Sequence, residues 1–305
     1  MLLCTLLSAC VWIGGCASQE TDKEQEVSEL QEESVKDSEE VLQQSETEEQ
    51  EELTMQSDSE EDDSDILMPK TLSIMGDSIS TFDEWIPEGY YDFYPMNGEV
   101  AYVNQTWWKM VMNDMDMELC VNASSAGSTC IGDSTGMDNP KYGCSDLRIS
   151  DLMGNDGTYP DIIIVYMGTN DFLMSIPIGS NDGTQYVEEG ELDNFSDAYS
   201  LMLDKMAAYY PGADIFCCNL PLIGDWGTER PFETMVNGQG LTSEDYSKEI
   251  ETIAAAKGCP IIDLQHCGIT IDNMGQYVSD GVHFKPEGMR LIRDAVETAI
   301  TGFYQ

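Results

Sequence analysis

The sequence predicts a parallel α/β domain after Met68, with helices packed on both faces of a central sheet. Short, nearly continuous apolar runs recur along this part of the chain, and amphipathic segments of helical period separate them. Apolar strands that alternate with helices indicate a parallel sheet that is buried on both sides. In such a sheet, chemically active residues gather at the carboxyl ends of the strands.

Five apolar runs are expected to form the strands. The clearest is Asp161–Met167 (DIIIVYM), in which hydrophobic residues follow one another without alternation. A run of this kind is typical of a strand covered on both faces. The other four strands are expected at Thr71–Met75, Glu118–Ala123, Ala213–Cys218 and Pro260–Leu264.

Helices are expected between and after these strands, because apolar residues recur there at helical spacing. Pro286 suits the first turn of the last helix, where its missing N–H has no intrahelical acceptor to lose. These helices would cover the two faces of the sheet. They are expected at Thr106–Met115, Ser196–Tyr210, Thr242–Lys257 and Pro286–Ile300.

Residues 1–16, MLLCTLLSACVWIGGC, indicate a signal peptide that ends in a lipobox. The apolar stretch is about a dozen residues long, too short for a permanent membrane-spanning helix. Ile13–Cys16 (IGGC) resembles a bacterial lipobox, so Cys16 is the expected lipid anchor. Cys10 is an alternative, although cleavage there would leave a signal of only about nine residues. An ordinary signal peptide without lipid is a further possibility.

Residues 17–67 predict a disordered acidic tether, and residues 68–305 predict one globular domain. The formal net charge is −45, with about −19 between Ser18 and Asp65 and about −26 on the remainder. The tether is too polar to form a core. A strongly acidic domain repels phosphate-rich polymers and anionic membranes, which excludes nucleic acid as a partner. We therefore expect membrane contact only through the N-terminal lipid, at the bacterial cell surface or envelope.

The cysteines and histidines do not indicate a metal site. If Cys16 carries lipid, seven other cysteines remain in the mature chain, an odd number that cannot all pair within it. Cys130 and Cys144 lie in loop-like sequence and are the candidate disulfide. His266 and His283 are the only histidines, and no CxxC pair or Cys/His cluster has metal-ligand spacing. Neither a metal nor a cofactor is expected.

A serine, a histidine and an aspartate stand where nucleophilic catalysis needs them. Ser78 follows the first strand directly, at the turn from a parallel strand to its helix. Serine is a weak nucleophile until a base removes its proton, and that base must be oriented by an acceptor. His283 lies in a loop before the last helix, three residues after Asp280. This spacing lets the carboxylate hold one imidazole nitrogen while the other faces Ser78.

Hydrogen-bond donors for an oxyanion are expected at the same edge of the sheet. The third strand ends in Gly168-Thr-Asn170-Asp, which places an amide side chain there. The second strand ends in NASSAG, which places Gly127 where backbone must approach a ligand closely. Acyl transfer needs such donors to stabilise the charge on the carbonyl oxygen.

At these residues the sequence resembles the SGNH (GDSL-like) hydrolase family. The blocks GDSIS, NASSAG, GTND and DGVH occur in family order, and the resemblance extends from about Leu72 to the C-terminus. It implies a flavodoxin-like, three-layer α/β/α fold with a five-stranded parallel sheet. It also implies Ser78 as nucleophile, His283 as base and Asp280 as the residue that orients the base. The oxyanion hole would combine the N–H groups of Ser78 and Gly127 with the Asn170 side chain.

Two other residues could compete for these roles. Ser134 lies in Gly132-Asp-Ser-Thr-Gly136, which repeats GDS and matches G-x-S-x-G. That motif needs a buried strand before it and a helix after it, whereas Ser134 lies in loop-like sequence. His266 follows Asp263 at the same spacing as His283 follows Asp280, but without turn-forming residues between them, so a surface role is favoured.

Aromatic residues after the nucleophile suggest a carbohydrate substrate. Trp85 and Tyr90 lie in an aromatic insertion, and Trp226 follows the fourth strand. Such rings could stack on sugars or could pack over the insertion. The expected function is hydrolysis of short acyl esters, acetyl above all, on carbohydrates. A lipase, lysophospholipase or arylesterase is the alternative within enzymes, and a non-catalytic glycan-binding module is the alternative outside them.

Overall fold

The structure, a computed structural model, describes residues 70–305. The expected signal peptide, the lipobox cysteine and the acidic tether lie outside the described residues and stay predictions. Within residues 70–305, none of the helices combines the length and the apolar character needed to cross a bilayer.

The core of the domain is a five-stranded sheet in which every neighbouring pair of strands is parallel. The spatial order is β2-β1-β4-β6-β7, which is the flavodoxin-like order 2-1-3-4-5 when only these strands are counted. The predicted sheet is therefore confirmed. Its strands are β1 Thr71–Gly76, β2 Glu118–Asn122, β4 Ile162–Tyr166, β6 Asp214–Cys218 and β7 Ile261–Ile262.

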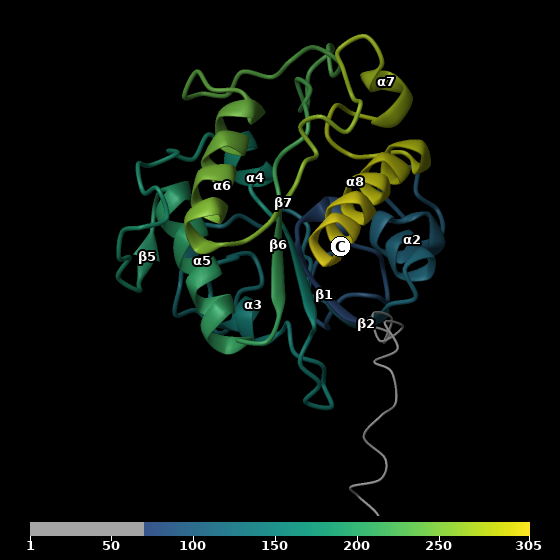
Figure 1. The fold of residues 1–305 in the computed structure, drawn as a ribbon. Coiled ribbons are helices and arrows are strands. Elements are labelled where there is room, and N and C mark those ends of the chain that lie inside the picture. The colour runs from purple at the N-terminus through teal and green to yellow at the C-terminus, as the bar shows by residue number, and fades with distance from the viewer. Residues whose placement is uncertain (1–69) are drawn as a thin grey trace, which may run out of the picture. The chain divides into compact units, whose positions relative to one another are not determined.

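Long helices cover both faces of this sheet (Figure 1). Helices α2 and α8 pack together on one face, and α5 and α6 pack together on the other. All four were predicted, and α8 extends four residues beyond its predicted end. Their bounds are α2 Trp107–Asp114, α5 Phe195–Tyr209, α6 Ser243–Lys257 and α8 Pro286–Tyr304.

The predicted strand Pro260–Leu264 is shorter in the structure. Only Ile261 and Ile262 pair with β6. The side-chain carbonyl of Asn219 accepts the backbone N–H groups of Leu264 and Gln265, at 2.6 and 2.9 Å. After Ile262, hydrogen bonds to the Asn219 side chain therefore take the place of strand–strand hydrogen bonds.

Several short elements were not predicted from the sequence, because segments of two to five residues are too short to show a period. The strands β3 and β5 pair antiparallel in a separate ribbon. These elements are η1 Ser78–Ser80, η2 Val103–Gln105, β3 Gly132–Asp133, α3 Asp146–Ser150, α4 Thr169–Leu173, β5 Glu191–Leu192 and α7 Met274–Tyr277.

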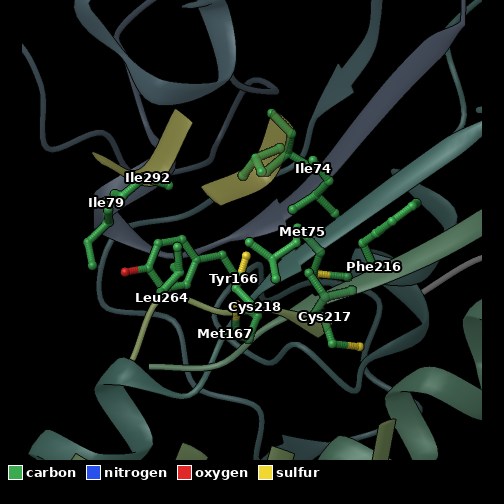
Figure 2. Close-up of a cluster of buried hydrophobic side chains, with 14 of the residues drawn as sticks. Ile74, Met75, Ile79, Tyr166, Met167, Phe216, Cys217, Cys218, Leu264 and Ile292 are labelled. Atoms are coloured by element: carbon green, nitrogen blue, oxygen red, sulfur yellow. The ribbon is translucent and has the colours of Figure 1, made fainter. Parts of the chain in front are cut away.

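Apolar side chains from neighbouring strands fill the space on both sides of the sheet (Figure 2). Cys217 and Cys218 are consecutive in β6 and both are fully buried. Because successive side chains of a strand point to opposite faces, their burial shows that both faces of β6 are covered. Cysteine acts here as a small hydrophobic residue.

The candidate disulfide is not formed in the structure. Cys130 and Cys144 are both free thiols, as are the other five cysteines of residues 70–305. The two lie on adjacent segments, and Cys144 N donates to Cys130 O at 3.1 Å. Burial raises the pKa of both thiols, that of Cys144 to about 12, so neither is a ready nucleophile at neutral pH.

Candidate active site

The turn after β1 is built to present a serine. Gly76 has no room for a side chain, because a Cβ there would lie 2.7 Å from both Ser124 Oγ and Ser80 Oγ. The carboxylate of Asp77 accepts the backbone N–H of Ile79 at 3.0 Å and so caps the short helix η1. Ser78 is the first residue of that helix, which follows the strand without a longer loop.

The structure brings Ser78 to His283 across 205 residues of chain. Ser78 Oγ lies 3.0 Å from His283 Nε2, and the opposite ring nitrogen, Nδ1, lies 2.7 Å from Asp280 Oδ2. Both Ser78 and His283 are nearly buried, with 6% and 7% of their surface exposed. An ionised carboxylate can only accept, so the ring proton is on Nδ1 and Nε2 can accept the proton of Ser78.

Asp280 is held as a carboxylate by its own loop. Its Oδ1 accepts the backbone N–H groups of Val282 and His283 at 3.0 and 2.8 Å. Burial acts to raise the pKa of Asp280, but the hydrogen bonds and charge of His283 and the two N–H groups outweigh it. The pKa is lowered to about 2. Asp280 is therefore ionised at neutral pH and can stabilise an imidazolium.

Three donors lie at the carboxyl ends of neighbouring strands. Among the described residues, neither Ser78 N nor Gly127 N has a hydrogen-bond acceptor. Gly127 has a φ of +72°, a conformation that glycine adopts without the strain of a side chain. Asn170 in α4 donates through Nδ2 to Ser128 O at 2.9 Å, which leaves the second amide hydrogen for another acceptor.

The carbonyl of Gly76 joins the turn that carries Ser78 to the turn that carries Gly127. It accepts Ser125 N at 3.1 Å, Ser128 Oγ at 3.3 Å and Arg148 Nη2 at 3.0 Å. Arg148 is fully buried in α3. Sequence reasoning missed it, and the only signal was a lone arginine in an acidic, partly apolar segment.

Asp171 anchors the loop that follows the Gly127 turn. It lies next to Asn170, is fully buried, and accepts the N–H groups of Cys130 and Ile131 at 2.9 and 3.4 Å. Burial raises the pKa of Asp171 to about 6, against the lowering effect of these two donors. Its place in the GTND block was visible in the sequence, but its role as an anchor was not.

The two competing residues lie away from this constellation. Ser134 is fully buried, and its Oγ accepts the N–H of Gly190 at 2.9 Å, a bond between two loops. The side chain of His266 is 79% exposed, and its Nδ1 lies 2.9 Å from Asp263 Oδ2. Among the described residues, no serine lies within hydrogen-bond distance of His266.

The three aromatic residues considered for sugar binding differ in their surroundings. The hydroxyl of Tyr90 donates to Asp151 at 2.8 Å, so it already has an acceptor inside the protein. Trp85 packs on Trp108 and lines a groove of about 310 Å³ beside the edge strand β2. Trp226 is 48% exposed, so part of its ring is accessible to solvent.

Comparison with known proteins gives consistent matches for the described domain. Residues 70–226 match the family model of the GDSL-like lipases and acylhydrolases. The fold is similar to solved structures assigned as GDSL-like lipases from Bacteroides ovatus and Bacteroides uniformis, at 25% and 26% identity and TM-scores of 0.55 and 0.56. These alignments cover 77% of this chain and 100% and 96% of the two solved chains.

A protein from Lactobacillus plantarum has a TM-score of 0.58 at 20% identity, over 77% of this chain and 98% of the solved one, and supports the fold. A search of curated proteins found no significant match.

Proposed function

Because this chain belongs to the GDSL-like lipase/acylhydrolase family, it is a serine ester hydrolase, and we propose that it removes short acyl groups, acetyl above all, from carbohydrates. The observation that carries the chemical part of the proposal is the unbroken path from Ser78 Oγ through His283 to Asp280, at 3.0 and 2.7 Å. At its serine end, the N–H of Ser78 has no acceptor among residues 70–305, and neither has the N–H of Gly127.

In the proposed mechanism, Ser78 Oγ attacks the ester carbonyl as its proton passes to His283 Nε2. The negative charge on the carbonyl oxygen is stabilised by Ser78 N, Gly127 N and Asn170 Nδ2. His283 then gives its proton to the departing alcohol, which leaves an acyl group on Ser78. Water, deprotonated by His283, attacks this acyl group, and the carboxylic acid departs as the proton returns to Ser78.

Exposed aromatic rings on loops that contact the site support a carbohydrate as the substrate. Trp226 lies on the loop whose Gly224 N–H donates at 2.8 Å to the carbonyl of Gly281, two residues before His283. Tyr91 is 54% exposed, and its backbone carbonyl accepts the N–H of Ala126 at 2.7 Å, next to Gly127. Flat, exposed rings can stack on the apolar faces of sugars. The acidic surface disfavours an anionic lipid interface.

Acyl-chain and polymer assays test this substrate. We expect the domain from about residue 68 to hydrolyse p-nitrophenyl acetate faster than longer acyl esters and to release acetate from acetylated xylan or another acetylated glycan. Trp226→Ala should raise KM on the glycan and leave p-nitrophenyl acetate unaffected. Tyr186→Ala, which removes an exposed tyrosine of another loop, is the control. A preference for long acyl chains would favour a lipase instead.

We further propose that Cys16 carries lipid and holds the enzyme at the cell surface or envelope, with residues 17–67 as the spacer. The composition of this segment supports the proposal, because a charged, polar chain of about 50 residues extends far from its anchor point.

Asn170→Ala is expected to lower kcat by about 10²–10³-fold with little change in KM. The amide acts mainly when charge reaches the carbonyl oxygen, so its loss affects the transition state more than the bound substrate. Steady-state kinetics on p-nitrophenyl acetate measure both constants. Thermal unfolding of the variant controls for the lost bond to Ser128 O. A rise in KM at constant kcat would assign Asn170 to substrate binding alone.

A further inference from the structure

Phe93 lies flat against the imidazole of His283. The ring centroids are 3.6 Å apart, and the ring planes differ by only 9°. Phe93 belongs to the aromatic insertion after the nucleophile and packs against the core rather than standing free. The catalytic steps proposed above give it no part.

The backbone of Phe93 is tied to the nucleophile turn. Phe93 N donates to Thr81 Oγ1 at 2.9 Å, and the Thr81 hydroxyl donates to Ser78 O, also at 2.9 Å. These two hydrogen bonds connect the backbone of Phe93 to the backbone of Ser78 through the Thr81 side chain.

The next residue ties the insertion to the histidine loop. Tyr94 is fully buried, and its hydroxyl donates to the backbone carbonyl of Phe284 at 2.9 Å. Its own carbonyl accepts the N–H of Asp83 at 2.9 Å, which closes the insertion on itself. The insertion therefore contacts the residues that flank both Ser78 and His283.

We propose that Phe93 is a positioning residue that holds the plane of the His283 ring. The two hydrogen bonds of the imidazole act at Nδ1 and Nε2, at opposite sides of the ring. They fix the axis between these atoms but resist rotation about that axis only weakly. A flat aromatic face at 3.6 Å blocks this rotation. It also favours the imidazolium that forms during the reaction, because a cation is attracted to the face of an aromatic ring.

This role predicts a loss that depends on the leaving group. His283 must protonate the departing alcohol, and alkoxides of ordinary alcohols need that proton far more than p-nitrophenolate does. A tilted imidazole would still accept a proton from Ser78 in part of its population. The same tilted imidazole would protonate the departing alcohol less often, because this step needs Nε2 to point at the leaving oxygen.

The test compares Phe93→Leu, which fills similar space without an aromatic face, with Phe93→Tyr and Phe93→Trp, which keep one. We expect Phe93→Leu to lower kcat/KM, which reports the steps up to departure of the alcohol, about 10–100-fold on an alkyl acetate, part of the contribution of general acid–base catalysis, and clearly less on p-nitrophenyl acetate. KM should change less than about twofold. Tyr or Trp should recover most of the activity. Phe303→Leu, at the end of α8, is the matched control.

The inference rests on the proposed roles of Ser78 and His283, and hydrolysis of both esters by the unaltered protein tests those roles separately. An unchanged kcat/KM in Phe93→Leu, or an equal loss of kcat/KM on both esters, would overturn the positioning role. A rise in KM as the main effect would also overturn it, because it would mean that Phe93 contacts substrate. If Phe93→Leu does not fold, Phe93→Met takes its place with the same expected outcomes.

Discussion

Ser78→Ala is expected to lower kcat on p-nitrophenyl acetate by up to about 10⁶-fold, to near the uncatalysed rate. The substitution removes the only hydroxyl within hydrogen-bond distance of His283 Nε2 among the described residues. No acyl group can then be transferred to the protein. Because Ser78 is only 6% exposed and its Oγ bonds only to His283, the loss of one oxygen should leave the fold intact.

Ser134→Ala is the matched control for this prediction. Ser134 lies in the second GDS of the chain, and its Oγ serves only to accept Gly190 N and so to hold two loops together. We expect a small decrease in thermal stability, because a net hydrogen bond contributes about 1 kcal/mol, and unchanged kcat. Substantial turnover by Ser78→Ala, or loss of turnover by a folded Ser134→Ala, would place the active site elsewhere.

Asp280→Asn is expected to lower kcat by about 10⁴-fold while the local fold is kept. Asp280 Oδ1 accepts two backbone N–H groups, those of Val282 and His283, so the amide oxygen of the new side chain takes that place. Its NH₂ group then faces His283 Nδ1 and can only donate. Nδ1 becomes an acceptor, the ring proton moves to Nε2, and Nε2 can no longer take the proton of Ser78.

Asp263→Asn provides the control, because Asp263 contacts His266 with the same local geometry and at nearly the same distance. Both variants remove a carboxylate that contacts Nδ1 of a histidine three residues later, but only His283 faces a serine, and His266 is exposed to solvent. Asp263→Asn should therefore leave kcat unchanged. The idea fails if Asp280→Asn keeps more than about a tenth of the activity, or if both variants lose activity to a similar extent.

The elements that the sequence predicted correctly are those with a repeated local signal. The run DIIIVYM needed no knowledge of its neighbours to be read as a buried strand, and Pro286 marked the first turn of α8. The segments that were missed, such as α4 and η1, contain five residues or fewer. At that length the pattern holds too few apolar positions to distinguish a helix from a turn.

In the candidate site, too, the residues that the sequence placed correctly are those next to elements with a repeated local signal. Ser78, Asn170 and Gly127 follow predicted strands directly, so their place at one edge of the sheet followed from the strand assignment. Arg148 and Phe93 belong to loops or short helices whose path depends on what they pack against. Their contacts, with Gly76 O and with the His283 ring, join segments far apart in the chain.

By itself the sequence determined the α/β class, the order of the strands along the chain and the family to which its motifs belong. Its local pattern favoured His283 over His266 only through the turn-forming Gly281, because both spacings bring a carboxylate to Nδ1. Only the tertiary structure places one histidine 3.0 Å from Ser78 and leaves the other in solvent. A local motif sets the geometry between residues three apart, whereas a partner 205 residues away is reached only by the path of the folded chain.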